Sequence, residues 1–262
     1  KLDHEKKPYA VAGVPPDYFI KTGQLWGNPV YDWDALQETG YQWWADRLAH
    51  NLMLFDIVRI DHFRGFVNFW QVPQGETTAV NGAWAEAPAK DFFNKMLKMF
   101  KDFPIIAEDL GFLTDDVKEI IKKYKFPGMK ILLFAFDSDD ENPYLPHNHV
   151  ENCVVYTGTH DNNTAKGWFK QEATDHIKQK MREVLGEEPV LEDVHWQLVT
   201  LAECSVADTV IVPMQDVLGL DETCRMNIPG TVDHNWQWRL LPGQANPSLA
   251  KQLSKLVKEN RR

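Results

Sequence analysis

The sequence has few cysteines, no long apolar run and no excess of basic residues, and each shortage excludes a class of protein. Its three cysteines stand far apart, so we expect reduced thiols, a cytoplasmic chain and no metal site. The longest apolar runs, such as 131–136, are far shorter than the roughly 20 residues that cross a bilayer, and residues 1–10 lack the apolar core of a signal peptide. Acidic residues outnumber basic ones by 38 to 28. We therefore expect no membrane segment, no export signal and no nucleic-acid partner.

Aromatic residues are what the sequence has in abundance. The 262 residues include ten tryptophans, with 44% hydrophobic and 25% charged residues overall. These proportions are ordinary for a globular protein, and the length is close to the roughly 250 residues of one (β/α)8 barrel. Tryptophan either fills a core or offers a flat apolar face to a ligand. Because sugar rings have apolar C–H faces, the tryptophans point to carbohydrate as a candidate ligand, with core packing as the alternative.

Apolar strands and amphipathic helices alternate along most of the chain, which predicts an α/β fold with a parallel sheet buried on both faces. We expect strands at 55–61, 104–109, 129–136, 152–158 and 208–214. We expect helices at 88–100, 114–124, 174–185, 191–205 and 247–260. The strands are followed by polar or charged residues, and the carboxyl ends of parallel strands are where such folds carry their chemistry.

Three carboxylates, Asp61, Glu108 and Asp161, lie at or just beyond the ends of three of these strands. Their separations fit one or two barrel units of about 30 residues each, so in a barrel all three would meet at one mouth. Cleavage of a glycosidic bond needs a carboxylic acid to protonate the leaving oxygen and a carboxylate opposite it, which attacks the sugar in retaining enzymes. Arg59 lies on the same side of its strand as Asp61 and would stabilise its charge. His160 could hydrogen-bond a sugar hydroxyl.

Each of these residues also has a purely structural interpretation. An aspartate at the end of a strand is often a helix cap or a loop residue, and Arg59 with Asp61 can be a plain ion pair. His160 can be a polar residue that serves only the fold. A metal site at His160 and Asp161 lacks the tight ligand cluster that a metal needs.

Several longer runs make the chain similar to the 4-α-glucanotransferases, the amylomaltases or disproportionating enzymes of glycoside hydrolase family 77. They stand in family order and cover nearly the whole chain: AGVPPDYF (12–19), TGQLWGNPVYDW (22–33), RIDHFRGF (59–66), IAEDLG (106–111), PGMKILLFAF (127–136), TGTHDNNT (157–164), PMQDVLGL (213–220), RMNIPGT (225–231) and NWQWR (235–239). The resemblance implies retaining transfer of α-1,4-glucan segments between maltooligosaccharides, through a covalent glycosyl-enzyme intermediate and without a metal or organic cofactor.

The resemblance also assigns roles to the matching residues. Asp61 matches the nucleophile, Glu108 the general acid/base and Asp161 the stabiliser of the transition state. One of Phe134 and Phe136 is expected to form an acceptor-side platform, with Phe136 as the first choice. The other expected substrate contacts are Arg59, His160, Trp26, Asp17 and Asn227.

The family's chains are much longer than this one. The resemblance places the strand before Asp61 fourth among eight, so it implies the C-terminal part of a (β/α)8 TIM barrel, about strands 4–8, in incomplete form. We treat residues 1–262 as one catalytic portion with loop insertions at about 12–33 and 66–90, and expect the missing N-terminal barrel half in a longer polypeptide. Alone, the chain would expose sheet edges, and we expect it to be poorly soluble or inactive.

Two other functions fit the same residues. A hydrolase or branching enzyme of the α-amylase-like clan shares the three acids. From maltotriose, a hydrolase would give net reducing ends, whereas a transferase gives glucose and a ladder of longer glucans. A truncated glucan-binding domain would keep the aromatic residues and lack turnover. The expected compartment is the cytoplasm, or a plastid if the source is a plant or an alga.

Overall fold

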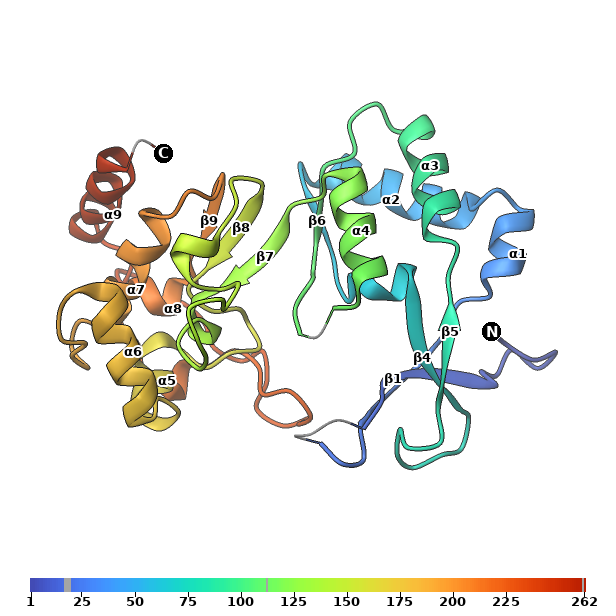
Figure 1. Cartoon of the computed structure of the whole chain (residues 1–262), viewed down its shortest axis with the longest axis horizontal. Helices are drawn as coiled ribbons and strands as arrows, with labels where there is room; N and C mark the ends of the chain where they lie inside the picture. Colours follow the sequence, from blue (N-terminus) through green and yellow to red (C-terminus); the bar gives the residue numbers. More distant parts are fainter. Residues whose placement is uncertain (17–19, 112, 261) are drawn as a thin grey trace. The chain divides into compact units, whose positions relative to one another are not determined.

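The computed structural model of the chain describes residues 1–16, 20–111, 113–260 and 262. The chain forms two compact units, Lys1–Gly128 and Met129–Arg262, which can be followed by colour in Figure 1. In the described residues, no helix is long and apolar enough to span a membrane.

The first unit contains an antiparallel sheet in the order β2-β1-β4-β5. Its strands are β1 (Ala10–Val14), β2 (Gln24–Pro29), β4 (Asn68–Pro73) and β5 (Ala83–Glu86). Gly13 pairs with Leu25 on one side and with Trp70 on the other. A Cβ at Gly13 would lie 2.5 Å from the carbonyl oxygen of Gln24, so this close approach of backbones requires glycine. The stretches 12–33 and 66–90, expected as loop insertions, contribute these strands.

The other sheet of the first unit is a parallel pair, β3 (Val58–Ile60) and β6 (Ile105–Ala107), in which Ile60 lies opposite Ala107. Both strands lie within the ranges that the sequence predicts. The helices of the unit are α1 (Trp33–Glu38), α2 (Gln42–Leu54), α3 (Ala89–Met99) and α4 (Asp115–Tyr124), and a 3-10 turn, η1 (Phe63–Phe66), follows β3.

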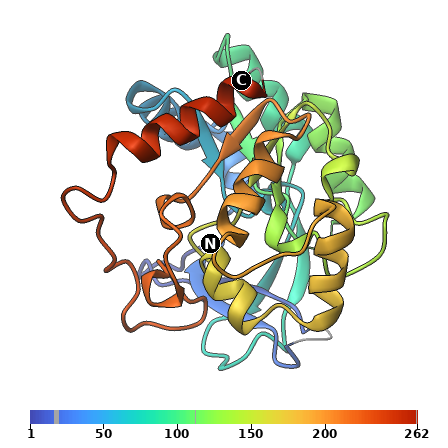
Figure 2. The ribbon, with the colours of Figure 1, turned by 90° about the vertical axis from the view of Figure 1, so that its left-hand side faces the viewer.

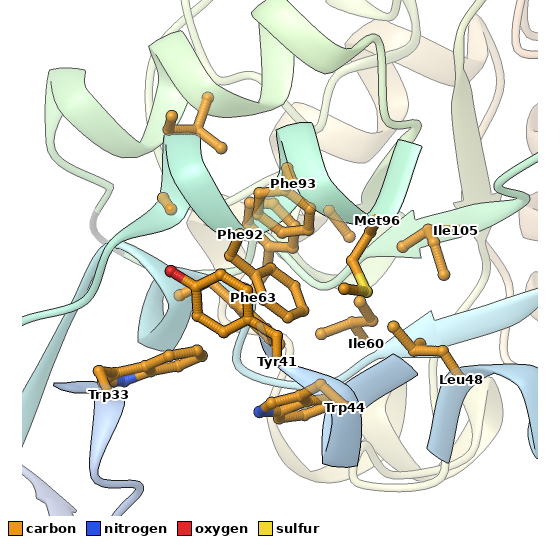
Figure 3. Packing of buried hydrophobic residues seen from close by; sticks show 14 of the residues in the cluster. Trp33, Tyr41, Trp44, Leu48, Ile60, Phe63, Phe92, Phe93, Met96 and Ile105 are labelled. Atoms are coloured by element: carbon orange, nitrogen blue, oxygen red, sulfur yellow. The ribbon is translucent and has the colours of Figure 1, made fainter. Parts of the chain in front are cut away.

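Aromatic side chains fill the core of the first unit (Figure 3). Phe63 and Phe93 are fully buried and stack with their ring centroids 5.4 Å apart. Trp33 and Trp44 each meet Phe92 edge to face at 5.8 Å. Burial of one such side chain stabilises a fold by roughly 1.5–3 kcal/mol. Part of the tryptophan content of the sequence is therefore core packing.

The second unit is built on a sheet in the order β7-β8-β9. Its strands are β7 (Gly128–Ile131), β8 (Cys153–Tyr156) and β9 (Thr209–Ile211), and β8 and β9 run parallel. The helices are α5 (Ala165–Gln171), α6 (Asp175–Leu185), α7 (Val194–Glu203), α8 (Met214–Val217) and α9 (Pro247–Glu259). Three 3-10 turns complete the described part of the unit: η2 (Leu132–Phe134), η3 (Pro146–Asn148) and η4 (Glu222–Cys224). Figure 2 shows α9 in red and the long segment that leads to it from α8.

The parallel pairs β3–β6 and β8–β9 confirm a mixed α/β fold, and the described residues of neither unit form a closed barrel. All five expected strands are shorter than their predicted ranges, and the run 129–136 departs from its prediction the most. The apolar run 129–136 leaves the extended conformation after Ile131 and continues as η2. There the Leu133 N–H donates to the Thr157 carbonyl at 3.2 Å, and Asn142 Nδ2 donates to the Phe134 carbonyl at 2.8 Å. These bonds hold the chain in a turn although its residues favour a strand.

Candidate active site

Arg59 and Asp61 form an ion pair at the end of β3. The distance from Arg59 Nη2 to Asp61 Oδ1 is 2.8 Å, and the Asp61 side chain is 78% exposed while that of Arg59 is 29% exposed. The two residues are separated by one position, so alternation along the strand places both side chains on one side. The carboxylate is thus open to a ligand and is held by a less exposed guanidinium.

Glu108 lies directly beyond β6, the strand paired with β3. Its backbone continues the parallel register, because its N–H donates to the Ile60 carbonyl at 2.9 Å and its carbonyl accepts from the Phe63 N–H at 3.1 Å. Its half-buried side chain accepts two backbone hydrogen bonds, from the His62 N–H to Oε2 at 2.6 Å and from the Leu110 N–H to Oε1 at 3.0 Å. The carboxyl group is therefore fixed beside the end of β3.

The environment of Glu108 favours its protonated form. Burial raises the pKa of this carboxyl above its usual range, and the negative charge of Asp61 adds to the increase. The two backbone hydrogen bonds and Arg59 oppose the shift without reversing it. A carboxyl with a raised pKa next to an open carboxylate is the arrangement that glycosidases use for an acid and a nucleophile.

His62 joins these two acids and was missed in the sequence. Its backbone has a left-handed conformation, φ 47°, and its N–H donates to Glu108 Oε2. Its ring meets Trp26 edge to face, with centroids 4.7 Å apart. Burial, assisted by the charge of Arg64, lowers the pKa of this imidazole to about 4, so the ring is neutral at physiological pH. The only sequence signal was its place inside the run RIDHFRGF.

A cavity of about 510 Å³ opens beside Asp61 in the first unit. It is lined partly by polar and charged side chains, among them Arg59, Asp61 and Asn28, and partly by aromatic rings, among them Trp26 and Tyr31. Trp26 is 43% exposed, and its indole N–H donates to Gln24 Oε1 at 3.2 Å. Aromatic faces together with polar side chains suit a sugar, which has both C–H faces and hydroxyl groups.

The second unit brings together His160, Asp161 and Asn227. Asn227 Nδ2 donates to Asp161 Oδ1 at 2.6 Å, and His160 Nε2 lies 3.3 Å from Asp161 Oδ2. Arg225, which was not predicted, donates from Nη2 to the Asp161 carbonyl at 2.7 Å and from Nε to the Asn227 carbonyl at 2.9 Å. The segments 157–164 and 225–231, which are far apart in the sequence, therefore meet at Asp161.

Trp236 is a second residue of this group that the sequence did not single out. It is 54% exposed, and its ring centroid lies 5.2 Å from that of His160 with the planes tilted by 37°. Its backbone is left-handed, with φ 61°, and its N–H donates to the Met226 carbonyl at 2.7 Å. A large aromatic residue in this conformation is unusual. The run NWQWR contained it, but no pattern distinguished it from the neighbouring Trp238.

The remaining predicted contacts differ in their accessibility. Phe136 is fully buried and packs on Trp168 at 6.2 Å, whereas Phe134 is half-buried against Tyr144 at 5.6 Å. Of the two, Phe134 is the one that a ligand can reach. Asp17 lies outside the described residues.

Arg59, Asp61, Glu108 and Trp26 belong to the first unit, while His160, Asp161 and Asn227 belong to the second. Contacts link residues of each group within its own unit, such as Arg59 with Asp61 and Asn227 with Asp161. Among the described residues, we find no cluster of three or more His, Cys, Asp or Glu side chains that could hold a metal ion.

Comparison with known proteins gives consistent results. The sequence model of a family described as 4-alpha-glucanotransferase, glycoside hydrolase family 77, matches residues 1–244. A 4-alpha-glucanotransferase of Synechocystis is 55% identical over 256 residues, which cover 97% of this chain and 50% of that protein. A chloroplastic/amyloplastic 4-alpha-glucanotransferase of Solanum tuberosum is 46% identical, with coverage of 97% and 44%.

A solved structure is also similar. The amylomaltase of Streptococcus agalactiae, in complex with acarbose, matches with a TM-score of 0.95 at 37% identity, covering 100% of this chain and 53% of that one. The chain thus spans about half the length of the relatives that it matches.

Proposed function

This chain belongs to the 4-alpha-glucanotransferase family, glycoside hydrolase family 77, and on that premise we propose that it supplies the three acids of retaining α-1,4-glucan transfer. In the first step, Asp61 attacks the anomeric carbon of the donor glucan while Glu108 protonates the departing oxygen. In the second step, Glu108 takes the proton from a hydroxyl group of the acceptor glucan. That hydroxyl then attacks the glycosyl carbon and releases Asp61.

One observation carries this proposal: Asp61 and Glu108 follow adjacent parallel strands in opposite environments. Asp61 is open and bound to Arg59, as a nucleophile should be. Glu108 is half-buried, and burial raises its pKa, as a proton donor needs. A carboxyl group with a raised pKa beside an exposed carboxylate is what the acid and the nucleophile of a glycosidase require.

The second unit would bind the sugar that reacts. Asp161, held by Asn227 and Arg225, is proposed to stabilise the positively charged transition state. His160 is proposed to hydrogen-bond a hydroxyl group of the same sugar, and Trp236 to offer its ring as a flat contact. The Streptococcus amylomaltase binds acarbose, which is an α-glucan analogue. This supports the proposal that the present chain binds maltooligosaccharides.

We further propose that residues 1–262 are the C-terminal part of one catalytic barrel, about strands 4–8, and that turnover needs the barrel half that this chain does not cover. The relatives' greater length supports this. The chloroplastic name of the potato relative supports a plastid location if the source is a plant or an alga. For any other source we propose the cytoplasm. A glucan-binding fragment without turnover is the competing proposal, since the two groups of site residues belong to separate units.

A chimera tests the function directly. This chain would replace the part of the Streptococcus amylomaltase that it matches, and the chimera would be incubated with maltotriose. Glucose and a ladder of longer glucans, lost on Asp61→Asn because an amide cannot form the intermediate at a useful rate, are the expected result. A folded chimera that only hydrolyses maltotriose, or that keeps its transfer rate with Asn at position 61, would contradict the proposal.

A further inference from the structure

Asp216 is a buried carboxylate in the second unit that none of the proposed chemical steps uses. It lies on α8, shortly after β9, and is 2% exposed. Oδ2 accepts a hydrogen bond from the Thr157 hydroxyl at 2.6 Å, and Oδ1 accepts one from the Ala165 N–H at 2.7 Å. Both distances are short, as expected of hydrogen bonds to a charged acceptor.

These two partners are the two ends of the loop that carries His160 and Asp161. Thr157 directly follows β8, and Ala165 is the first residue of α5. Between them the loop has local bonds of its own, such as the Thr159 N–H to Asn162 Oδ1 at 2.9 Å. Asp216 therefore connects the two ends of the loop, the residue after β8 and the first residue of α5.

The residue before Asp216 anchors the other segment that reaches Asp161. Gln215 is 7% exposed, and its Nε2 donates to the Cys224 carbonyl at 3.2 Å. Cys224 directly precedes Arg225, which donates to the Asp161 carbonyl. Two consecutive residues of one short helix thus hold the two segments that meet at Asp161.

A buried carboxylate is a costly way to hold a loop. Burial raises the pKa of Asp216, while its two hydrogen bonds act in the opposite direction, so the fold keeps a group whose charged form it disfavours. A buried polar group whose hydrogen bonds are satisfied holds its partners in one geometry. Asp216 is too deeply buried to touch a substrate, so any role in the reaction must act through the loop.

We propose that Asp216 is a positioning residue, which fixes the loop 157–165 so that Asp161 and His160 face the reacting sugar, with Gln215 fixing the segment 224–227 on the other side. This inference rests on the proposed function in one respect, the use of Asp161 in glucan transfer. The positioning itself is independent of turnover and can be measured in the chain alone.

The first test is amide hydrogen exchange on the full chain, comparing Asp216→Ala and Asp216→Asn with the wild type. Asp216→Ala removes both acceptors, and exchange at 158–165 should rise at least about tenfold, the loss expected for hydrogen bonds to a charged group. Asp216→Asn keeps one oxygen, and the Thr157 hydroxyl can turn to accept from the new amide. Its increase should therefore be smaller, a partial rescue.

Glu203→Gln is the matched control. Glu203 is 6% exposed, its pKa is likewise raised by burial, and it faces Arg262 at the end of α7. It should change the melting temperature without changing exchange at 158–165. The positioning role is overturned if Asp216→Ala leaves that exchange within twofold of the wild type, or if the control raises it as much. If Asp216→Ala fails to fold, Thr157→Val replaces it and must raise exchange at 158–161.

The second test is kinetic and uses the chimera. With kcat normalised to the folded fraction, Asp216→Asn should lower kcat for maltotriose more than it raises KM. A merely structural defect would leave both kcat and KM unchanged after this normalisation. If amide exchange at 158–165 changes as expected in the Asp216 variants but the chimera has no turnover, the positioning role stands and the proposed function is refuted. Turnover with a kcat unchanged by both Asp216 variants overturns the link between Asp216 and the reaction.

Discussion

The backbone N–H of His62 donates a 2.6 Å hydrogen bond to the side-chain carboxyl of Glu108. This bond joins the turn after β3 to the residue after β6, and it orients the proposed general acid beside the proposed nucleophile. It also favours the charged form of Glu108, which burial disfavours. The acidity of Glu108 is therefore set by two opposing contributions, of which burial is the larger.

Replacement of Glu108 should affect the reaction according to the leaving group. In the chimera, Glu108→Gln should lower transfer from maltotriose by roughly 10²–10⁴-fold, because the departing glucan is no longer protonated. A maltosyl fluoride donor needs no such proton, so formation of the glycosyl-enzyme should persist. Glu119→Gln, at an exposed position on α4, is the control. Equal losses with both donors would refute the role of Glu108 as the acid.

The low pKa of His62 should make the fold sensitive to acid. Its folded pKa of about 4 lies below the ordinary value of 6.5, so the unfolded chain takes up the proton first as the pH falls. The contribution of His62 to stability is present above pH 6.5 and is lost as the pH falls toward 4. Asparagine tolerates a positive φ and does not titrate, so His62→Asn should flatten this slope.

Urea unfolding of wild type and His62→Asn from pH 4 to 7 measures the effect. His149 and His195, whose pKa values are also lowered by burial, contribute equally to both proteins and cancel in the difference. Parallel pH dependences would show that His62 is not the group responsible.

Loss of the Trp236 ring should weaken binding of acarbose to the chimera. An aromatic contact contributes about 0.5–1.5 kcal/mol beyond the burial of area, so Trp236→Ala should raise the dissociation constant by roughly 2–13-fold in calorimetry. Trp84→Ala is the matched control, because Trp84 is 48% exposed and its ring contacts Trp70 and Arg64, away from the cavity beside Asp61. Equal affinities for wild type and Trp236→Ala would remove this residue from the sugar site.

An exposed apolar patch at the end of α2 should make the isolated chain self-associate. Met53, Leu54, Phe55 and Ile57 are 72%, 58%, 59% and 53% exposed, and they lead into β3, which pairs only with β6 among the described residues. Such patches next to a sheet edge promote aggregation. Leu54→Lys with Phe55→Glu should raise the concentration at which light scattering appears. Val232→Lys, at a 93% exposed position, should not.

The sequence predicted most of the elements that carry the site. The strands before Asp61 and Glu108 are found within their expected ranges because continuous apolar runs bounded by charge are a strong local signal. The antiparallel strands at 12–33 and 66–90 were not expected. Apolar and polar residues do not alternate regularly along these strands, which also contain glycine and proline. Their extended conformation depends on pairing between segments that are far apart in the sequence.

Residues whose roles depend on loop conformation could not be found in this way. His62 and Trp236 each have a left-handed backbone, a conformation that only a few per cent of residues other than glycine adopt. Asp216 binds residues at the two ends of a loop more than fifty positions earlier, and no local pattern marks that pairing. The ion pair of Arg59 and Asp61 was predictable because alternation along one strand is enough to bring the two together.

The backbone conformation of the turn at His62 contributes to the pKa of Glu108, because the amide of that turn donates to the Glu108 carboxyl. No side chain supplies the hydrogen bond to Glu108 Oε2, so no truncation at position 62 removes it while φ stays positive. A β-branched residue resists a positive φ, so the turn after β3 would have to rearrange. A longer hydrogen bond to Oε2 would then leave burial to act on Glu108 with less opposition. His62→Val would therefore raise the pKa of Glu108, 46 positions away, by changing the conformation of the turn, without adding or removing a charge.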